Sequence, residues 1–269
     1  MPSIPGGTLS VNFGNSITSN LIGCWVPGPM GGADLSLNGV TLTKDTNYAN
    51  ASCADGIGMN PTQANSGLYN TGGAMPASYG NWTNLTMWVR FAMPSAAPAS
   101  GDGFYFLGIF PTIAGGSPFT VAGLTWAVAS TETRQLVWNT GGTFTSGTAT
   151  SLAGVTPGNM VDWFGEFTVN GAVAVYGAVD GVTLGQVGGT NSFGASAPTS
   201  TTLSLGLGTA ATALTQFSNA VTPIAAIWNR LLSLSEMQSL HFNGTVGNPY
   251  QFIVGGTGLS VIGLAASEW

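Results

Sequence analysis

Apolar residues alternate with other residues along several short segments, the pattern that predicts β-strands with one face turned to a core. In residues 84–93 every odd position is apolar, and in residues 161–169 every odd position is apolar or glycine. The second segment leads through Asn170-Gly171 to another alternating segment, residues 173–179, and this dipeptide predicts a two-residue β-hairpin turn because both residues tolerate positive φ. Further strands are expected at residues 21–26, 104–110, 124–129, 135–139, 203–207 and 223–228.

One short helix is expected after the last of these strands. Ser233 and Glu236 have the spacing of a capping box, in which a hydroxyl and a carboxylate satisfy the first free amides of a helix. We expect the helix to run to about Phe242 and to be stopped by Asn243-Gly244. The pattern predicts an all-β fold of two stacked antiparallel sheets, a sandwich or jelly roll, with one short C-terminal helix.

Charged residues are unusually scarce. They make up 5% of the 269 residues, with 4 Lys and Arg against 10 Asp and Glu and a net charge of -6. Nucleic-acid binders gain most of their affinity by neutralising phosphates with basic side chains, and a negative chain is repelled by anionic membranes. Neither nucleic acid nor a membrane is therefore expected as a partner. The 44% of hydrophobic residues predicts a folded chain.

The composition shows no break that would mark a linker, so one domain with two extensions is expected. We place the domain at residues 20–252, the N-terminal extension at 1–19 and an apolar, glycine-rich C-terminal tail, a candidate assembly contact, at 253–269. A secretory signal and a membrane-spanning segment are not expected. Cys24 and Cys53 can form one disulfide, and two reduced thiols are the simpler interpretation.

Four motifs spread over roughly residues 20–252 carry a family resemblance. They are NLIGCWVPG with DLSLNGVTLT, NLTMWVRFAM, VAVYGAVDGVTLG, and IAAIWNRLLSLSEMQSLHFN followed by NPYQF. Together they resemble laminin G-like or concanavalin A-like jelly-roll domains, especially those of phage and prophage virion proteins. The C-terminal motif is the most specific, being similar to the family's closing strand, Asn-Arg turn, capped helix and Asn-Pro-aromatic exit. The resemblance implies a concanavalin A-like jelly roll.

The motif positions have mainly structural interpretations. Trp25 and Trp228 are expected in the core, and Arg230 is expected to cap a turn or to pair with Glu236. Loop residues such as Asp34 and Asn38 are expected to hold their own loop through bonds to the backbone. The complete set of motif positions is Trp25, Asp34, Asn38, Trp228, Asn229, Arg230, Ser233, Glu236 and Pro249.

No catalytic residues are expected. Retaining glycoside hydrolases of this family carry a Glu-x-Asp-x-Glu run, which the sequence lacks. Asp162 and Glu166 lie four residues apart on one strand face, so their Cα atoms are roughly 13 Å apart at about 3.3 Å per residue, too far for a retaining pair. His241, the only histidine, lies near the end of the predicted helix, where capping of carbonyls is commoner than catalysis.

No metal or other cofactor is predicted, although calcium stays open. Zinc needs about four Cys, His or carboxylate ligands, and the three Cys and His residues are scattered. Calcium takes carboxylate, amide and backbone oxygens. The loop residues of this kind are Asp34, Asn38, Asp55 and Asp102, and they form no dense acidic cluster.

Sugar binding is an open alternative, because jelly-roll lectins combine an aromatic platform with Asn, Asp and Gly-loop donors. Trp82 is the aromatic residue expected to be the most exposed. The other candidates, expected to share one concave sheet face, are Trp88, Arg90, Asp162, Glu166 and Tyr176. A tryptophan in a strand is, however, more often part of the core or of a subunit contact.

Two functions follow from these observations. The first is a non-enzymatic structural protein of a bacteriophage virion, a capsid decoration or a tail or fibre component, which is assembled in the host cytoplasm as a homo-oligomer with other virion proteins. A surface rich in hydroxyls and amides suits such packing. The second is a carbohydrate-binding module that recognises host or mucus glycans. An enzyme acting on polysaccharide is a weaker third interpretation, because the carboxylate run is missing.

Overall fold

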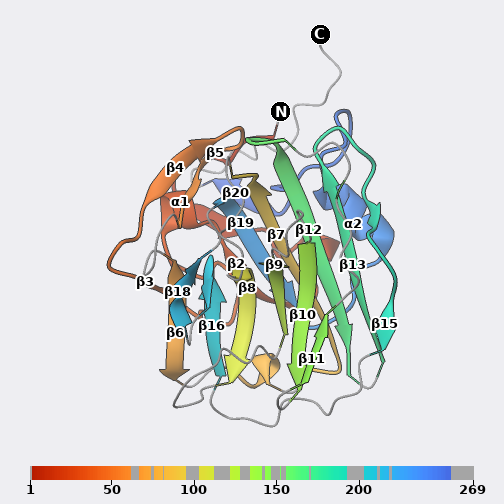
Figure 1. The fold of residues 1–269 in the computed structure, drawn as a ribbon. Coiled ribbons are helices and arrows are strands. Elements are labelled where there is room, and N and C mark those ends of the chain that lie inside the picture. The colour runs from red at the N-terminus through yellow and green to blue at the C-terminus, as the bar shows by residue number, and fades with distance from the viewer. Residues whose placement is uncertain are drawn as a thin grey trace.

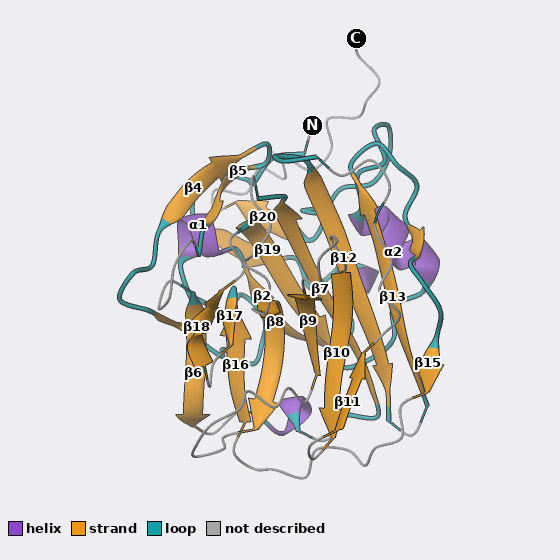
Figure 2. Ribbon diagram, viewed as in Figure 1, coloured by secondary structure: helices purple, strands orange, loops and turns teal. Residues whose placement is uncertain are grey.

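The chain folds into stacked antiparallel β-sheets with short helices at their margins (Figures 1 and 2). The computed structural model describes residues 2–61, 67–73, 76–80, 82–94, 103–111, 122–127, 134–140, 143–146, 152, 156–169, 171–192, 203–210, 213–217 and 220–255.

The strands are β1 (Leu9–Val11), β2 (Leu21–Trp25), β3 (Thr43–Lys44), β4 (Asn50–Cys53), β5 (Gly56–Met59), β6 (Leu68–Gly73), β7 (Asn84–Ala92), β8 (Gly103–Pro111), β9 (Ala122–Ala127), β10 (Arg134–Thr140), β11 (Thr143–Ser146), β12 (Met160–Thr168), β13 (Ala172–Val179), β14 (Gly185–Gln186), β15 (Asn191–Ser192), β16 (Leu203–Leu207), β17 (Thr209–Ala210), β18 (Ala213–Phe217), β19 (Val221–Trp228) and β20 (Ile253–Gly255). The helices are α1 (Pro27–Met30), α2 (Leu234–Leu240) and the 3-10 helices η1 (Ser16–Thr18) and η2 (Ala77–Tyr79).

Two large sheets form the predicted sandwich. One runs in the order β11-β10-β9-β8-β16-β6-β3, and the other runs along β14-β13-β12-β7-β19-β5-β4, with β2 also paired to β19 and β15 to β13. Alternation in β7 directs Met87 and Val89 into the core between the sheets, where Leu107 of β8 and Leu205 of β16 also lie. The all-β, two-sheet antiparallel jelly roll predicted from the sequence is confirmed. Each predicted strand is present, with ends within two residues wherever the structure describes them.

The hairpin of β12 and β13 confirms the predicted pairing but not the predicted turn. The two strands are antiparallel, with Phe167 opposite Val173 and Asp162 opposite Ala178. β12 ends at Thr168 and β13 begins at Ala172, so three residues connect them rather than two. Residue 170 itself lies outside the described residues.

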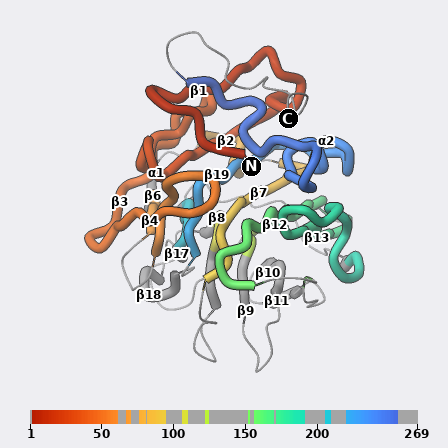
Figure 3. The backbone as a smooth tube through the Cα atoms, turned by 90° about the horizontal axis from the view of Figure 1, so that it is seen from above, coloured from red at the N-terminus to blue at the C-terminus, as the bar shows by residue number. Residues whose placement is uncertain are grey.

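A third layer covers much of the outer face of the nine-stranded sheet, as the view from above shows (Figure 3). Here β1 pairs antiparallel with β20, with Leu9 opposite Gly255 and Val11 opposite Ile253. A second apolar cluster joins these strands and α2 to Trp88 of the sheet. Residues 9–11 and 253–255, which the sequence analysis assigned to the two extensions, therefore pair with each other. The rest of the predicted tail, residues 256–269, lies outside the described part of the chain.

Helix α2 begins with the predicted capping box and ends earlier than predicted. The Ser233 hydroxyl accepts from the Glu236 amide, and the Glu236 carboxylate accepts from the Ser233 amide. The last helical residue is Leu240, and His241 is extended. Gly247 has a φ of +89°, and a Cβ there would lie 1.7 Å from the carbonyl oxygen of His241, so only glycine lets this loop fold back on the helix end. Within the described residues, none of the helices has the length and apolar composition needed to cross a membrane.

Candidate functional site

The outer face of the nine-stranded sheet carries the polar residues that the sequence placed together. Register sets Arg90 of β7 opposite Asp162 of β12, Trp88 opposite Phe164, and Thr86 opposite Glu166. Because side chains alternate along a strand, these residues share the face opposite the main core. The prediction that Trp88, Arg90, Asp162, Glu166 and Tyr176 lie on one face is confirmed.

Arg90 is the centre of a buried ionic group on this face, and its side chain is 0% exposed. Its Nε and Nη2 donate to the two oxygens of Asp55 at 2.5 and 3.2 Å. Its Nη1 donates to Asp162 at 2.7 Å, and Nη1 and Nη2 donate to Asp180 at 2.8 and 2.7 Å. The Tyr250 hydroxyl donates to Asp55 at 2.8 Å. All five guanidinium bonds are charge-assisted, the strongest class of hydrogen bond in proteins.

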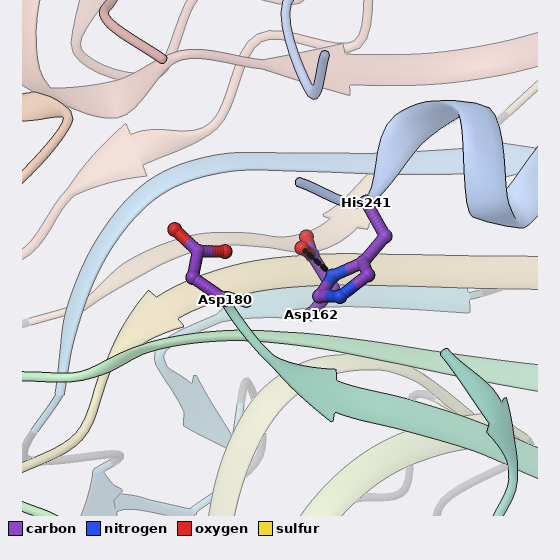
Figure 4. A group of neighbouring side chains, drawn as sticks. All are labelled: Asp162, Asp180 and His241. Carbon is purple, nitrogen blue, oxygen red and sulfur yellow. Dashed lines mark hydrogen bonds and ion pairs between the residues drawn. The ribbon is translucent and has the colours of Figure 1, made fainter. Parts of the chain in front are cut away.

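His241 completes this group from the end of α2 (Figure 4). Its Nδ1 lies 2.8 Å from Oδ2 of Asp162, and its Nε2 lies 2.7 Å from the carbonyl oxygen of Val182. The other Asp162 oxygen accepts from Nε1 of Trp88 at 2.9 Å. We call the group of Asp55, Arg90, Asp162, Asp180 and His241 the Arg90 cluster.

Burial and charge act against each other on the members of the Arg90 cluster. Burial lowers the pKa of His241, but the hydrogen bond and the charge of Asp162 outweigh it and raise the pKa above the usual value. Burial raises the pKa of Asp180, and the contacts with Arg90 offset only part of that rise. The guanidinium is desolvated too, yet its aspartates raise the pKa of Arg90 further, so it stays charged.

The Arg90 cluster does not form a metal site, although it contains metal-ligand types. Donor atoms of Asp162, Asp180 and His241 lie within 4.8 Å of one another. Nη1 of Arg90 already bonds both aspartates, so a guanidinium stands where a cation would bind. Of the other calcium candidates, Asp34 holds its own loop, and residue 102 lies outside the described residues.

The open end of the same face holds Glu166 and Tyr176, which are both half-buried. A hydrogen bond joins the two side chains, and burial raises the pKa of Glu166 to about 7 despite it. Tyr176 faces Gln186 of β14 in register, and the Gln186 amide donates to Thr190 at 2.9 Å. A carboxylate and a phenol therefore lie side by side on this face, and both stay partly exposed.

The expected exposure of Trp82 is wrong, since only 1% of the residue is exposed and its ring packs edge-on against Phe167 at 6.4 Å. Trp88, Arg90 and Asp162 are likewise buried, each 0% exposed. For these three residues the physical reason is the third layer, which covers the face that alternation alone would leave open, whereas Trp82 lies in the core between the two sheets. Of the residues predicted to bind glycan, Glu166 and Tyr176 are the two that remain partly exposed.

Sequence reasoning missed most of the Arg90 cluster. Asp55 was weighed only for calcium, and Asp180 was part of a hairpin motif. His241 was expected to cap its own helix, but its ring bonds Val182 and Asp162 in other elements. The one available signal was that Arg90 and Asp162 alternate into predicted strands and that Asp180 directly follows one.

The core tryptophans and the N-terminal loop residues of the motifs behave as predicted. Trp25 and Trp228 are fully buried, at 0% exposure. The Asp34 carboxylate accepts backbone N–H bonds at 2.8, 2.9 and 3.0 Å. Asn38 donates through Nδ2 to the carbonyl of Ile22 at 2.7 Å. These contacts confirm that both polar residues hold the loop after β2.

The C-terminal motif is also structural. Arg230 pairs with Glu236 at 2.6 Å, as predicted. The Asn229 amide bonds the carbonyl of Asn20, and Pro249 is buried. Both cysteines are free thiols, as the simpler interpretation held.

The comparisons with known proteins identify the fold but no family. No protein-family model matches the sequence, and no curated protein matches it. Trypanosoma rangeli sialidase aligns with a TM-score of 0.54 at 17% identity, over 83% of this chain and 32% of that chain. The binding domain of Paraclostridial Mosquitocidal Protein 1 aligns with a TM-score of 0.57 at 12% identity, over 84% of this chain and 52% of that one. The botulinum neurotoxin serotype G binding domain gives 0.53 at 12%, over 82% and 50%.

Likeness at such identities concerns the fold alone. The chain has an all-β sandwich fold, and it spans about a third to a half of the solved chains that it resembles.

Proposed function

We propose that the chain is a non-enzymatic structural protein of a bacteriophage virion, a capsid decoration or a tail or fibre component. It is assembled in the host cytoplasm and packs as a homo-oligomer with other virion proteins, without nucleic acid or membrane as a partner. The virion context draws on the sequence motifs of the first and last core strands. The observation that carries the assembly role is the almost uncharged surface.

Among the described charged side chains, only Lys44 is exposed, and its ammonium lies 4.8 Å from the ring centroid of Tyr48. The others are buried or half-buried. A surface without charge repulsion keeps free protein poorly dispersed. Hydroxyl and amide groups can pack between copies without the cost of desolvating ions. This surface therefore supports repeated contacts between copies.

The test is the mass of the purified full chain by light scattering, beside a chain that ends at Gly255. The cut lies after β20 because that strand belongs to the packed domain. We expect a defined oligomer whose mass is unchanged between about 0.05 and 0.5 M salt, since neutral contacts are not screened. A full chain that stays monomeric at every concentration would contradict the proposal.

Two surface variants sharpen this experiment. Leu37 and Val246 are exposed by 81% and 62%, so Leu37→Lys and Val246→Lys add a charge at two loops without disturbing the core. If a contact between copies includes one of these loops, the substitution in that loop is expected to lower the measured mass of the oligomer. Lys44→Gln, which removes the exposed charge, is the matched control and leaves the oligomer intact.

Carbohydrate binding is the second candidate, and the open end of the outer face favours it. The Glu166 carboxylate can accept bonds from sugar hydroxyls, and the ring of Tyr176 offers a face for an apolar sugar surface. Two of the structural neighbours are described as binding domains of toxins. The ligand class would be a neutral glycan, because an acidic one would be repelled by Glu166.

A glycan array compares the unmodified chain with Glu166→Gln, which removes the charged acceptor, and Tyr176→Ala, which removes the ring. Loss of a charge-assisted bond is expected to weaken binding by roughly 10- to 100-fold. Glu236→Gln, a half-buried glutamate elsewhere, is the matched control and keeps the signal. Absence of signal from the unmodified chain on every glycan would overturn this candidate.

A further inference from the structure

We propose that the Arg90 cluster is a proton-operated clamp that holds the third layer on the nine-stranded sheet, closed when His241 is doubly protonated and loosened when it loses a proton. The proposal concerns the fold's response to acidity and does not depend on either candidate function.

The hydrogen-bond partners of the His241 ring indicate which of its nitrogens carry hydrogen. Nε2 faces the carbonyl oxygen of Val182, which can only accept, so Nε2 carries a hydrogen. Nδ1 faces Oδ2 of Asp162, which also accepts from Arg90. The other Asp162 oxygen accepts from Trp88, so this carboxylate accepts from both an arginine and an indole, and it is the acceptor toward Nδ1 as well. Both ring nitrogens therefore donate, and the ring is an imidazolium.

The net charge of the Arg90 cluster depends on the protonation of His241. Three aspartates face one guanidinium, and a neutral His241 would leave two negative charges uncompensated in a buried place. The imidazolium reduces the excess to one. Asp180, 23% exposed, is the member best placed to carry that remaining charge, because it reaches solvent. Buried charges are tolerated only when paired, so loss of the imidazolium proton is costly here.

The residues of the Arg90 cluster come from different layers, so the cluster connects these layers. Arg90, Asp162 and Asp180 belong to the sheet or to the end of its strand β13, whereas His241 ends α2 in the third layer. On the other side of the guanidinium, Asp55 accepts from Tyr250 in the segment that leads to β20. The imidazolium is thus an ionic link between the C-terminal end of α2 and the sheet, while Glu236 pairs with Arg230 near the start of the helix.

The direction of the pH effect follows from the groups that face His241. Asp162 and Asp180 face it directly, with Arg90 behind them, and segment 242–252 contributes Tyr250 as its titratable group, bound to Asp55. The folded-state pKa of His241 is raised above its unfolded value, chiefly because Asp162 outweighs burial. Its stabilisation is therefore complete below the unfolded pKa and is lost as pH rises through the folded pKa.

Asp180 acts in the same direction, because burial raises its pKa in the folded state. A raised carboxyl pKa means that the folded chain binds its proton more readily than the unfolded chain, so stability again increases as pH falls. The third layer is expected to be held more firmly at mildly acidic pH than at alkaline pH.

The decisive experiment is an NMR titration of the imidazole in the unmodified full chain. His241 is the only histidine, so its ring signals need no variant for assignment. We expect both ring nitrogens to be protonated at pH 6, with a midpoint above about 6.5. A ring that is neutral at pH 6, or a midpoint at or below that of a free histidine, would overturn the proposal.

A second experiment measures urea unfolding at pH 6 and 8.5 for the unmodified chain, His241→Asn and His241→Gln. The unmodified chain is expected to unfold at lower urea at pH 8.5, and the neutral variants to lose the part of that difference that comes from His241, while Glu166, whose pKa is raised to about 7, contributes the part that remains. Glu236→Gln, on the same helix but titrating far lower, keeps it. Equal midpoints for the unmodified chain at the two pH values would contradict the clamp, and this arm does not require the variants to fold.

Hydrogen exchange locates the loosening. Amides of α2 such as Met237, which bonds Ser233, are expected to lose protection at pH 8.5 beyond the intrinsic acceleration, while β12 amides keep theirs. Uniform loss over both elements would show that pH acts on the whole fold rather than through a clamp on the third layer.

Discussion

Two arginines bind carboxylates in this chain under opposite conditions. Arg90 is 0% exposed and holds three aspartates that lie 35, 72 and 90 residues away in the sequence. Arg230 is 22% exposed and holds Glu236, six residues away, which is 29% exposed. Each makes short bonds, so bond length does not separate them. Solvent does, because water can replace the partner of Arg230, whereas of the three partners of Arg90 only Asp180 is partly exposed.

The comparison teaches what a buried ion pair contributes. Building the Arg90 cluster required the removal of five ionisable groups from water, which consumes most of the attraction gained. Removing one partner costs more than forming the cluster gained, because the charged groups left behind cannot be rehydrated. The Arg90 cluster therefore indicates how the layers are positioned on one another rather than how stable the fold is. It also depends on every partner being present.

The largest expected effect is that of Arg90→Met. Three aspartates would remain without their cation, and we expect a loss of about 3–5 kcal/mol in the free energy of unfolding. Urea denaturation followed by circular dichroism measures it, with Arg230→Met as the matched exposed control. A loss below about 1 kcal/mol would mean that the aspartates find other partners or become protonated.

Trp88→Phe is expected to have the next largest effect. The indole donates to Asp162 and stacks on Phe164 with a ring separation of 5.7 Å. Phenylalanine keeps the stacking but removes the donor, so a loss of about 1–3 kcal/mol is expected for the unsatisfied carboxylate oxygen. Thermal unfolding compares it with Trp228→Phe, whose indole bonds a backbone carbonyl. A larger effect at Trp228 would mean that loss of packing, rather than loss of the bond to Asp162, determines the effect of replacing a tryptophan here.

Glu236→Gln is expected to cost only about 0.5–2 kcal/mol, through a weaker capping box and a lost surface pair. Its pKa is lowered to about 2, first by the hydrogen bond from Arg230, with the capping bonds adding to it. A lowered pKa gives stability that is present above the unfolded value and is lost as pH falls through the folded one. The difference between variant and unmodified chain should therefore shrink between about pH 4.5 and 2, opposite in direction to the effect of His241.

The smallest effect is expected for Lys44→Gln, within about 0.5 kcal/mol, since the residue is exposed and its contact with Tyr48 is a cation–π pair at the surface. Chemical denaturation checks it. A loss above 1 kcal/mol would show that exposed charge contributes more to this fold than the comparison of the two arginines implies.

Much of the fold could be predicted from the sequence because it follows from local rules. The strict alternation in residues 84–93 and 161–169 placed β7 and β12 and assigned their faces correctly. The Ser233 and Glu236 spacing placed the start of α2, and it also supported the pair with Arg230. Each of these inferences needs only residues within one element or one turn, where backbone geometry fixes the outcome.

The candidate site could be predicted only in part. Alternation put Glu166 and Tyr176 on the same face as Arg90, but it could not say which part of that face is covered. Trp82 looked exposed because it sits among Gly, Asn and Thr, and it is buried by a partner on a distant strand. Burial is a property of the assembled layers, so a one-dimensional pattern carries little of it.

By itself the sequence determined the all-β class, the strand faces, the capped helix and the scarcity of charge, because each depends on periodicity, neighbouring residues or counting. Only the tertiary structure decided that both ends of the chain join as β1 and β20, and that this layer encloses Arg90 with its aspartates and His241. The physical reason is distance along the chain: contacts between residues 35 to 90 positions apart arise from how sheets stack, and no local propensity records them.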